Sequence, residues 1–274
     1  MAGVKMPRLI YGTAWKKERT RSLVCDALAT GFRGIDTACQ PKHYHEPGVG
    51  EALNSLTSLG LRREDVFLQT KFTPLGGQDP RNVPYDSKAP LPVQVHQSLA
   101  QSLRNLQTSY IDSLVLHSPV GSFETTLTVW RAMEDLVHRG EVRQLGMSNC
   151  YDPAFLERLV RETILKPQVI QNRFYAETGY DKELRAFCRK QGIYYQSFWT
   201  LSANPHILSH PAVTRVADHY GITSAQVLFH YLQRMDIIPL TGTSSITHMQ
   251  EDLAALDLPI EPQHLSPLAD LADW

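Results

Sequence analysis

Short apolar stretches, rich in β-branched and aromatic residues, alternate along this chain with longer amphipathic ones. The short stretches are residues 8–14, 34–38, 66–72, 113–119, 142–149, 168–174, 194–200 and 237–242. Several of them are apolar at nearly every position instead of at every second one. This pattern is typical of parallel strands that are covered on both faces.

Between these stretches the apolar residues recur at the spacing of an α-helix. Within residues 125–141, five apolar side chains fall on one stripe: Leu127, Trp130, Met133, Leu136 and Val137. Gly140 follows where a helix C-cap is expected. Residues 223–235 form a second amphipathic segment, and Thr223 or Ser224 is its expected N-cap.

Strand and helix patterns that repeat eight times predict right-handed β-α-β units closing into a (β/α)8 barrel. The competing topology is a doubly wound open sheet, which usually carries a GxGxxG motif after its first strand. The corresponding segment here, "YGTAWKK", lacks that motif. Because no domain boundary is visible, we predict a single α/β TIM-barrel domain over residues 1–274.

Composition narrows the class of protein. The chain has 274 residues, of which 42% are hydrophobic and 20% charged, and a net charge of −1. This balance favours neither nucleic acid nor an anionic membrane surface as a partner. We find no signal peptide and no apolar run of the ~18 residues that a membrane span needs. The four cysteines are far apart and indicate free thiols, so we expect a cytoplasmic protein. We also expect a monomer or a weak homodimer.

Three ionisable residues stand at the carboxyl ends of three successive predicted strands: Asp36, Lys71 and His117. Active sites of β/α barrels form at this end, so the three side chains are expected to converge there. The longest predicted loop, residues 73–91, follows the third strand and should lie on the same face.

Several sequence blocks resemble the aldo-keto reductase superfamily, in order, from about residue 8 to residue 255. They are "FRGIDTA", "VGEAL", "FLQTK", "DSLVLHSP", "WRAMEDLVHRGEVRQLGMSN" and "KPQVIQNRFY". The resemblance implies a catalytic tetrad of Asp36, Lys71, His117 and a tyrosine. The family spacing places that tyrosine five residues after Asp36, where this chain has Pro41; Tyr44, the only tyrosine of the loop, is therefore the candidate.

These residue types suit carbonyl reduction. A hydride added to a carbonyl carbon leaves negative charge on oxygen, which needs a proton donor. We expect Lys71 to lower the pKa of Tyr44, Asp36 to hold Lys71 charged, and His117 to donate a hydrogen bond to the substrate oxygen. The hydride must come from a cofactor.

The resemblance also implies a nicotinamide cofactor, NADPH by preference with NADH possible. Ser148, Asn149 and Gln171 match residues that bind the carboxamide, and Phe198 or the neighbouring Trp199 should stack on the ring. Further expected cofactor contacts are Gly12, Thr13, Asp36, Leu201, Thr241, Gly242, Thr243, Ser244, His248, Glu251 and Asp252. A lysine and an arginine clasp the 2′-phosphate in many members; here Thr241 or Gly242 and His248 replace them, so the margin for NADPH should be modest.

The substrate should be a small, hydrophobic carbonyl compound, because the candidate pocket residues are mostly aromatic. They are Tyr11, Trp15, Tyr44, His45, His117 and Trp199, with loop 73–91 above them. Two alternatives stay open. One is a metal-dependent hydrolase that uses His43, His45 and His117, although we expect no metal; the other is a regulatory barrel that binds the cofactor without turnover.

Overall fold

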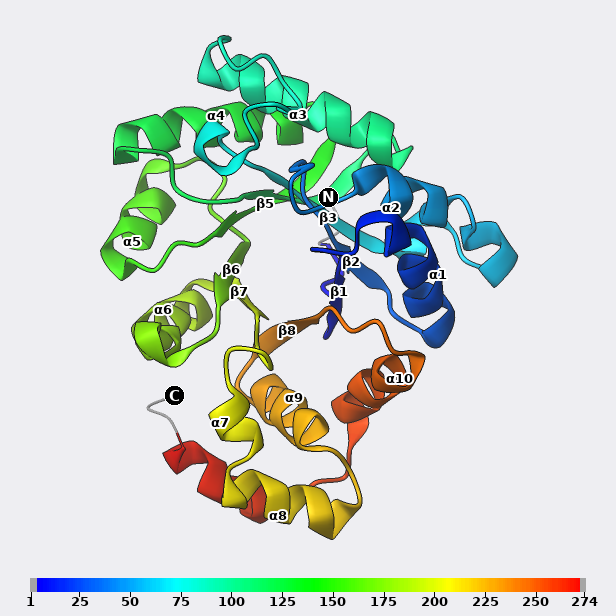
Figure 1. Ribbon diagram of the computed structural model, residues 1–274. Coiled ribbons are helices and arrows are strands. Elements are labelled where there is room, and N and C mark those ends of the chain that lie inside the picture. Colours follow the sequence, from blue (N-terminus) through cyan, green and yellow to red (C-terminus); the bar gives the residue numbers. More distant parts are fainter. Residues whose placement is uncertain (1–3, 272–274) are drawn as a thin grey trace.

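Eight parallel strands form the centre of the molecule and close into a barrel, because the first strand pairs with both the second and the last (Figure 1). The computed structural model describes residues 4–271, so both ends of the predicted 1–274 domain, residues 1–3 and 272–274, lie outside it. The strands are β1 (Ile10–Gly12), β2 (Gly34–Asp36), β3 (Phe67–Phe72), β4 (Ile111–Leu116), β5 (Val142–Ser148), β6 (Val169–Arg173), β7 (Tyr194–Phe198) and β8 (Ile237–Thr241). The predicted (β/α)8 barrel is confirmed.

Helices surround the barrel in Figure 1. They are α1 (Thr20–Thr30), α2 (Glu46–Leu53), α3 (Leu91–Leu106), α4 (Phe123–His138), α5 (Pro153–Glu162), α6 (Lys182–Gln191), α7 (Pro205–Leu208), α8 (Pro211–Tyr220), α9 (Ser224–Arg234), α10 (Ile246–Ala254) and α11 (Pro262–Leu265). None of the helices within residues 4–271 is long and apolar enough to cross a lipid bilayer.

The two helices expected from the sequence begin at capping residues. Ser122 accepts a hydrogen bond from the Thr125 N–H at the start of α4, and Gly140 follows that helix with a φ of 77°. Thr223, and not Ser224, caps α9 by accepting from the Gln226 N–H. The predicted stripe of α4 faces the core, where Trp130 is fully buried.

The strands are shorter at their carboxyl ends than the apolar runs suggest. β1 ends at Gly12 and β2 at Asp36, each two residues before the predicted end. Beyond β5 and β7, Asn149 and Trp199 adopt left-handed backbone conformations, with φ of 53° and 57°. A left-handed residue cannot continue a strand, so the chain turns away from the sheet at the edge where the candidate residues lie.

The pleat of the strands divides apolar from polar side chains. Leu68 and Phe72 of β3 pack outward into the main core beneath the helices. Ile10, Phe67 and Ile238 form a separate apolar cluster. Gln69 and Lys71, which alternate with Leu68 and Phe72 along β3, bind Asp36 near the carboxyl ends of the strands. The polar site therefore lies next to apolar side chains.

Candidate active site

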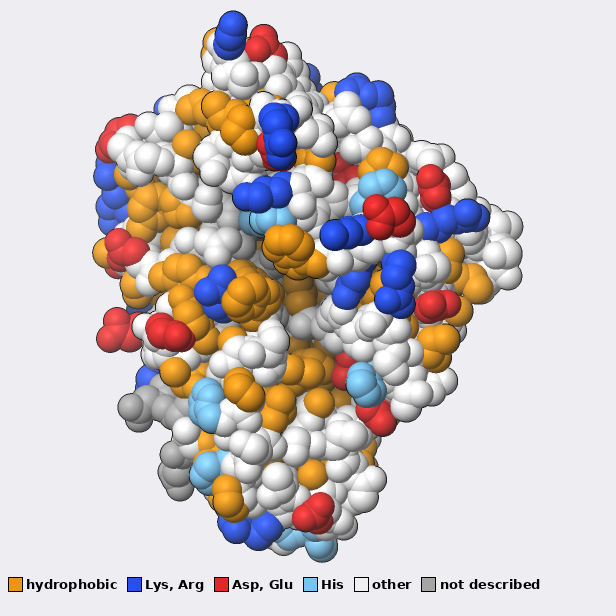
Figure 2. Space-filling model, viewed as in Figure 1, with side chains coloured by type: hydrophobic (Ala, Val, Ile, Leu, Met, Phe, Trp, Pro, Cys, Tyr) orange, Lys and Arg blue, Asp and Glu red, His pale blue; other side chains and the backbone are white. Residues whose placement is uncertain are grey.

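A cavity of about 680 Å³ opens at the carboxyl ends of the strands. In Figure 2, hydrophobic side chains gather around a hollow in the middle of this face, and Lys and Arg side chains lie close to them. The predicted site residues that line the cavity are Gly12, Trp15, Asp36, Tyr44, His117, Ser148, Gln171, Phe198, Trp199, Leu201, Thr241, Gly242, Thr243, His248, Glu251 and Asp252. Thr13, Lys71, Asn149 and Ser244 adjoin lining residues without lining the cavity themselves.

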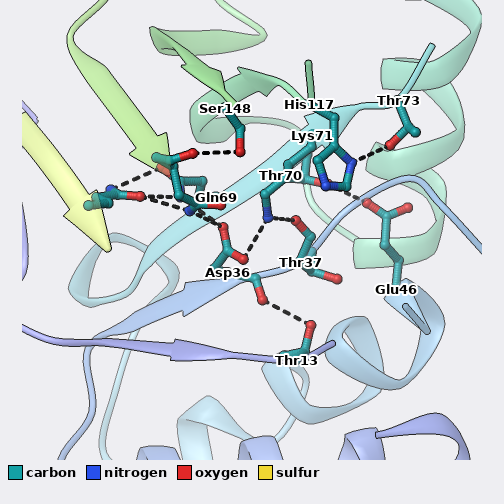
Figure 3. Close-up of polar contacts among 12 residues, drawn as sticks. Thr13, Asp36, Thr37, Glu46, Gln69, Thr70, Lys71, Thr73, His117 and Ser148 are labelled. Atoms are coloured by element: carbon teal, nitrogen blue, oxygen red, sulfur yellow. Dashed lines mark hydrogen bonds and ion pairs between the residues drawn. The ribbon is translucent and has the colours of Figure 1, made fainter. Parts of the chain in front are cut away.

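A buried ion pair lies beneath the cavity (Figure 3). The Lys71 Nζ atom lies 2.6 Å from Asp36 Oδ2 and donates a second hydrogen bond, of 2.8 Å, to the Thr37 carbonyl. Burial lowers the pKa of Lys71, and the Asp36 carboxylate opposes that change. Asp36 therefore uses its charge to hold Lys71 in place.

Three glutamine side chains fix the other oxygen of Asp36. Gln69 and Gln171 each donate to Asp36 Oδ1, at 2.8 and 3.0 Å, and each also donates to Gln196. Gln69 and Gln196 were missed in the sequence. Their signal is a glutamine at the third position of each short strand segment, "FLQTKF" and "YYQSF".

Tyr44 reaches this cluster in spite of its shifted position. A tight turn, in which the Tyr44 N–H donates to the Gln40 carbonyl, shortens the path of the loop. The Lys71 Nζ atom lies 5.1 Å from the centroid of the Tyr44 ring, and the His117 ring lies 6.1 Å away. Among the described residues, the Tyr44 hydroxyl makes no hydrogen bond to a protein group.

The electrostatics around Tyr44 differ from the expectation. Burial raises the pKa of Tyr44 above its usual value, and the charge of Asp36 adds to this effect. The expected lowering by Lys71 is not observed, because the Lys71 charge is paired with Asp36 at 2.6 Å. The phenol therefore holds its proton at neutral pH.

His117 is a neutral imidazole. Burial, followed by the charge of Lys71, lowers its pKa well below the usual value. Its Nδ1 atom lies 2.6 Å from the Thr73 hydroxyl, which fixes the orientation of the ring (Figure 3). Thr73 is the first residue of loop 73–91.

Residues expected at the nicotinamide lie along β5, β6 and β7. The Ser148 hydroxyl donates to the Gln171 carbonyl at 2.6 Å. The Asn149 amide donates to the His117 carbonyl, and Asn149 is not among the residues that line the cavity. Phe198 is half-buried, whereas Trp199 is 52% exposed, so two aromatic side chains stand side by side in the wall.

The segment after β8 forms the opposite wall. Thr241 donates to Asp252 at 2.7 Å, and burial raises the pKa of Asp252 to about 6. Ser245 caps α10 by accepting a hydrogen bond from the His248 N–H. Lys16, which the sequence analysis did not single out, lines the cavity and donates to the Gly242 carbonyl; its signal is the basic pair after Trp15 in "WKK".

Two predicted substrate residues are placed wrongly by the sequence analysis. Tyr11 is fully buried, because the pleat of β1 directs it outward against Phe32. His45 is exposed and accepts a hydrogen bond from the Gly48 N–H as the N-cap of α2. Its neighbour His43 lines the cavity instead, stacked 4.0 Å from Trp15.

Loop 73–91 also departs from the expectation. No residue of this loop lines the cavity. Gln78 donates to the carbonyls of Cys39 and Thr73, and Tyr85 donates to the Thr73 carbonyl. These hydrogen bonds fold the loop back onto its own beginning.

Within residues 4–271, no three His, Cys, Asp or Glu side chains are grouped to hold a metal ion.

The cavity suits a nicotinamide dinucleotide, because the side chains at its two ends match the two ends of such a molecule. Amide and hydroxyl groups lie beside aromatic rings at β5–β7, where a carboxamide ring would fit. Lys16 and the amino end of α10 lie at β1 and β8, where phosphate groups would fit.

A closed parallel barrel with its polar cluster at the carboxyl ends of the strands is the architecture of (β/α)8-barrel enzymes. The family model of the aldo/keto reductase family matches residues 8–203, so this chain belongs to that family. Its members are NAD(P)H-dependent oxidoreductases that act on carbonyl and alcohol groups. The resemblance seen in the sequence is thereby confirmed.

Relatives of similar length support this assignment. An aldo-keto reductase of Mycobacterium avium is 29% identical over 270 residues, which cover 98% of this chain and 87% of the relative. The NAD/NADP-dependent indole-3-acetaldehyde reductase of Schizosaccharomyces pombe is 30% identical over 267 residues, covering 92% and 86%. A crystal structure of an aldo/keto reductase from Brucella melitensis has a TM-score of 0.80 at 26% identity and covers 97% of this chain and 95% of that one.

Proposed function

We propose that this chain reduces the carbonyl group of a small, hydrophobic aldehyde or ketone, with Tyr44 as the proton donor. The observation that carries the proposal is the free Tyr44 hydroxyl at the cavity, beside the Lys71–Asp36 pair and His117. Bound NADPH or NADH would supply the hydride. The fission yeast relative is an NAD/NADP-dependent reductase, which supports the use of both cofactors.

Each polar residue then has a role in handling the proton or the oxygen. Tyr44 holds a proton that it can donate as negative charge develops on the substrate oxygen. Thr73 can donate to His117 Nδ1, which leaves the Nε2–H of His117 to stabilise that oxygen. Lys71, oriented by Asp36 and the Thr37 carbonyl, stabilises the phenolate that remains.

Other side chains would bind and orient the two reactants. Ser148 and Gln171, which line the cavity, would hold the carboxamide, and Phe198 would stack on the ring. The Asn149 role stays a prediction, because its amide is bound to the His117 carbonyl. Trp15 and Trp199, 60% and 52% exposed, offer apolar surface to the substrate. A monomeric or weakly dimeric protein in the cytoplasm likewise stays a prediction.

The test is turnover with a neutral aromatic aldehyde. We expect oxidation of NADPH, followed by absorbance, and one equivalent of the alcohol for each NADPH consumed, detected by chromatography. NADH should also support the reaction. Tight binding of NADPH without alcohol formation from any of a panel of aldehydes and ketones would contradict this proposal and support the regulatory alternative.

A further inference from the structure

Arg173, the last residue of β6, contacts two aromatic rings, and one of them, Trp199, lines the cavity although Arg173 itself does not. Its guanidinium carbon is 4.0 Å from the centroid of the Trp199 ring and 5.1 Å from that of Tyr175. Trp199 forms part of the cavity wall, and Arg173 pairs with Phe198 in the register of the two strands. A permanent cation is therefore held next to the apolar wall of the site.

The Arg173 guanidinium has no partner among the described residues. It forms no ion pair and donates no hydrogen bond, and its Nε atom is buried without an acceptor. Three other arginines that lie over aromatic rings are held by carboxylates: Arg63 and Arg143 bind Asp112, and Arg158 binds Glu124 and Glu162. Within residues 4–271, Arg185 has no carboxylate partner either, but it donates through Nε to the Tyr180 carbonyl, whereas the Nε atom of Arg173 has no acceptor.

This difference indicates a ligand. A guanidinium presents its donors as a planar fork that matches a carboxylate or a phosphate, and a buried donor without an acceptor is unfavourable. Stacking between Trp199 and Tyr175 holds the fork in one orientation, so little further order is lost when an anion binds.

The charges around the cavity favour the substrate as the source of that anion. Lys16 is the cation among the lining residues, and it lies at the β1 and β8 wall with the amino end of α10. Glu251 and Asp252 line that same wall and would repel the acidic group of a substrate from it, whereas the charge of Asp36 is paired with Lys71. Arg173 stands on the β6 side, next to the aromatic wall.

We propose that Arg173 binds the oxyanion of a carbonyl substrate that carries a carboxylate or phosphate group, while the apolar body of the substrate packs on Trp199. This inference rests on the proposed carbonyl reduction and names its substrate class: aromatic aldehydes and ketones with one acidic group.

The experiment compares two aldehydes of nearly the same shape, 4-carboxybenzaldehyde and its neutral methyl ester, methyl 4-formylbenzoate. Arg173→Gln should lower kcat/KM for the carboxylate by about 10- to 100-fold, mainly through KM, and by less than about threefold for the ester. Arg173→Lys keeps the charge but not the planar fork, so its kcat/KM for the carboxylate should lie between those of the unchanged protein and Arg173→Gln. Arg143→Gln is the matched control, since Arg143 also lies 4.0 Å over a tyrosine ring but pairs with Asp112.

A selective loss for the carboxylate, absent in Arg143→Gln, supports the inference. Equal losses for both aldehydes, or a weaker affinity for NADPH in a fluorescence titration, overturn it, because Arg173 would then support Trp199 or the cofactor. If Arg173→Gln does not fold, Arg173→Lys decides by the same criterion. Reduction of the ester by the unchanged protein tests the carbonyl reduction separately.

Discussion

Burial and the charge of Asp36 both raise the pKa of the Tyr44 phenol, and burial contributes more. The nearby ammonium of Lys71 is committed to Asp36 and the Thr37 carbonyl. A raised pKa means that the proton stays on Tyr44 throughout the neutral range, which is the form a proton donor needs.

Two adjacent aromatic residues compete for the stacking position at the nicotinamide. If the half-buried Phe198 stacks, Phe198→Ala should weaken cofactor binding by about 0.5–1.5 kcal/mol beyond the loss of buried area. Trp199→Ala should act mainly on the KM of the substrate, because more than half of the Trp199 side chain is exposed. Quenching of intrinsic fluorescence by the cofactor and steady-state kinetics measure the two effects. The reverse pattern would assign stacking to Trp199.

At the scale of elements, the segment from β8 into α10 sets the preference between the two cofactors. Thr241, Gly242 and His248 occupy the region that the family resemblance assigns to the 2′-phosphate, and Glu251 and Asp252 also line it. The amino end of α10 offers backbone N–H groups to a phosphate, but carboxylates close to it repel one. The net preference therefore depends on the charge of Asp252.

This dependence predicts an effect of pH on cofactor choice. The pKa of Asp252 is raised to about 6, so the carboxylate is charged at pH 8 and becomes neutral as the pH falls through 6. Loss of that charge removes repulsion, and the affinity for NADPH relative to NADH should rise. Asp252→Asn should tighten NADPH binding at pH 8 and have little effect at pH 5.5, with NADH nearly unchanged at both.

Dissociation constants from fluorescence titration at the two pH values provide the measurement. Asparagine keeps an acceptor for the Thr241 hydroxyl, so this variant isolates the charge. His248→Arg should tighten NADPH binding at both pH values, because a guanidinium is permanently charged. A strong preference for NADPH that neither pH nor Asp252→Asn alters would mean that another cation, such as Lys16, holds the phosphate.

At the scale of the whole molecule, the sequence predicts those features that depend on periodicity along the chain. The alternation of strands and helices defines the barrel, and the barrel brings Asp36, Lys71 and His117 together from three successive strands. The turn around Gln40 that returns Tyr44 to the site could not be predicted, since its hydrogen bond depends on the local path of the loop.

Side-chain direction explains the errors and the omissions. Tyr11 is one residue from the inward-facing Gly12, and one position along a pleated strand reverses the face. His45 serves as a helix cap, a role that depends on where α2 begins. The significance of Gln69, Gln196 and Arg173 depends on contacts with residues more than twenty positions away, such as Asp36 for Gln69 and Trp199 for Arg173. The local sequence pattern does not reveal such contacts.

The central claim is that Tyr44, at its shifted position, is the acid of the reduction. The most direct measurement is the single-turnover rate of NADPH oxidation by Tyr44→Phe with a neutral aromatic aldehyde, alongside the affinity for NADPH. We expect the rate to fall by about 10²-fold or more with the affinity nearly unchanged, because only the proton donor is lost. A rate close to that of the unchanged protein would contradict the account and would mean that another group donates the proton.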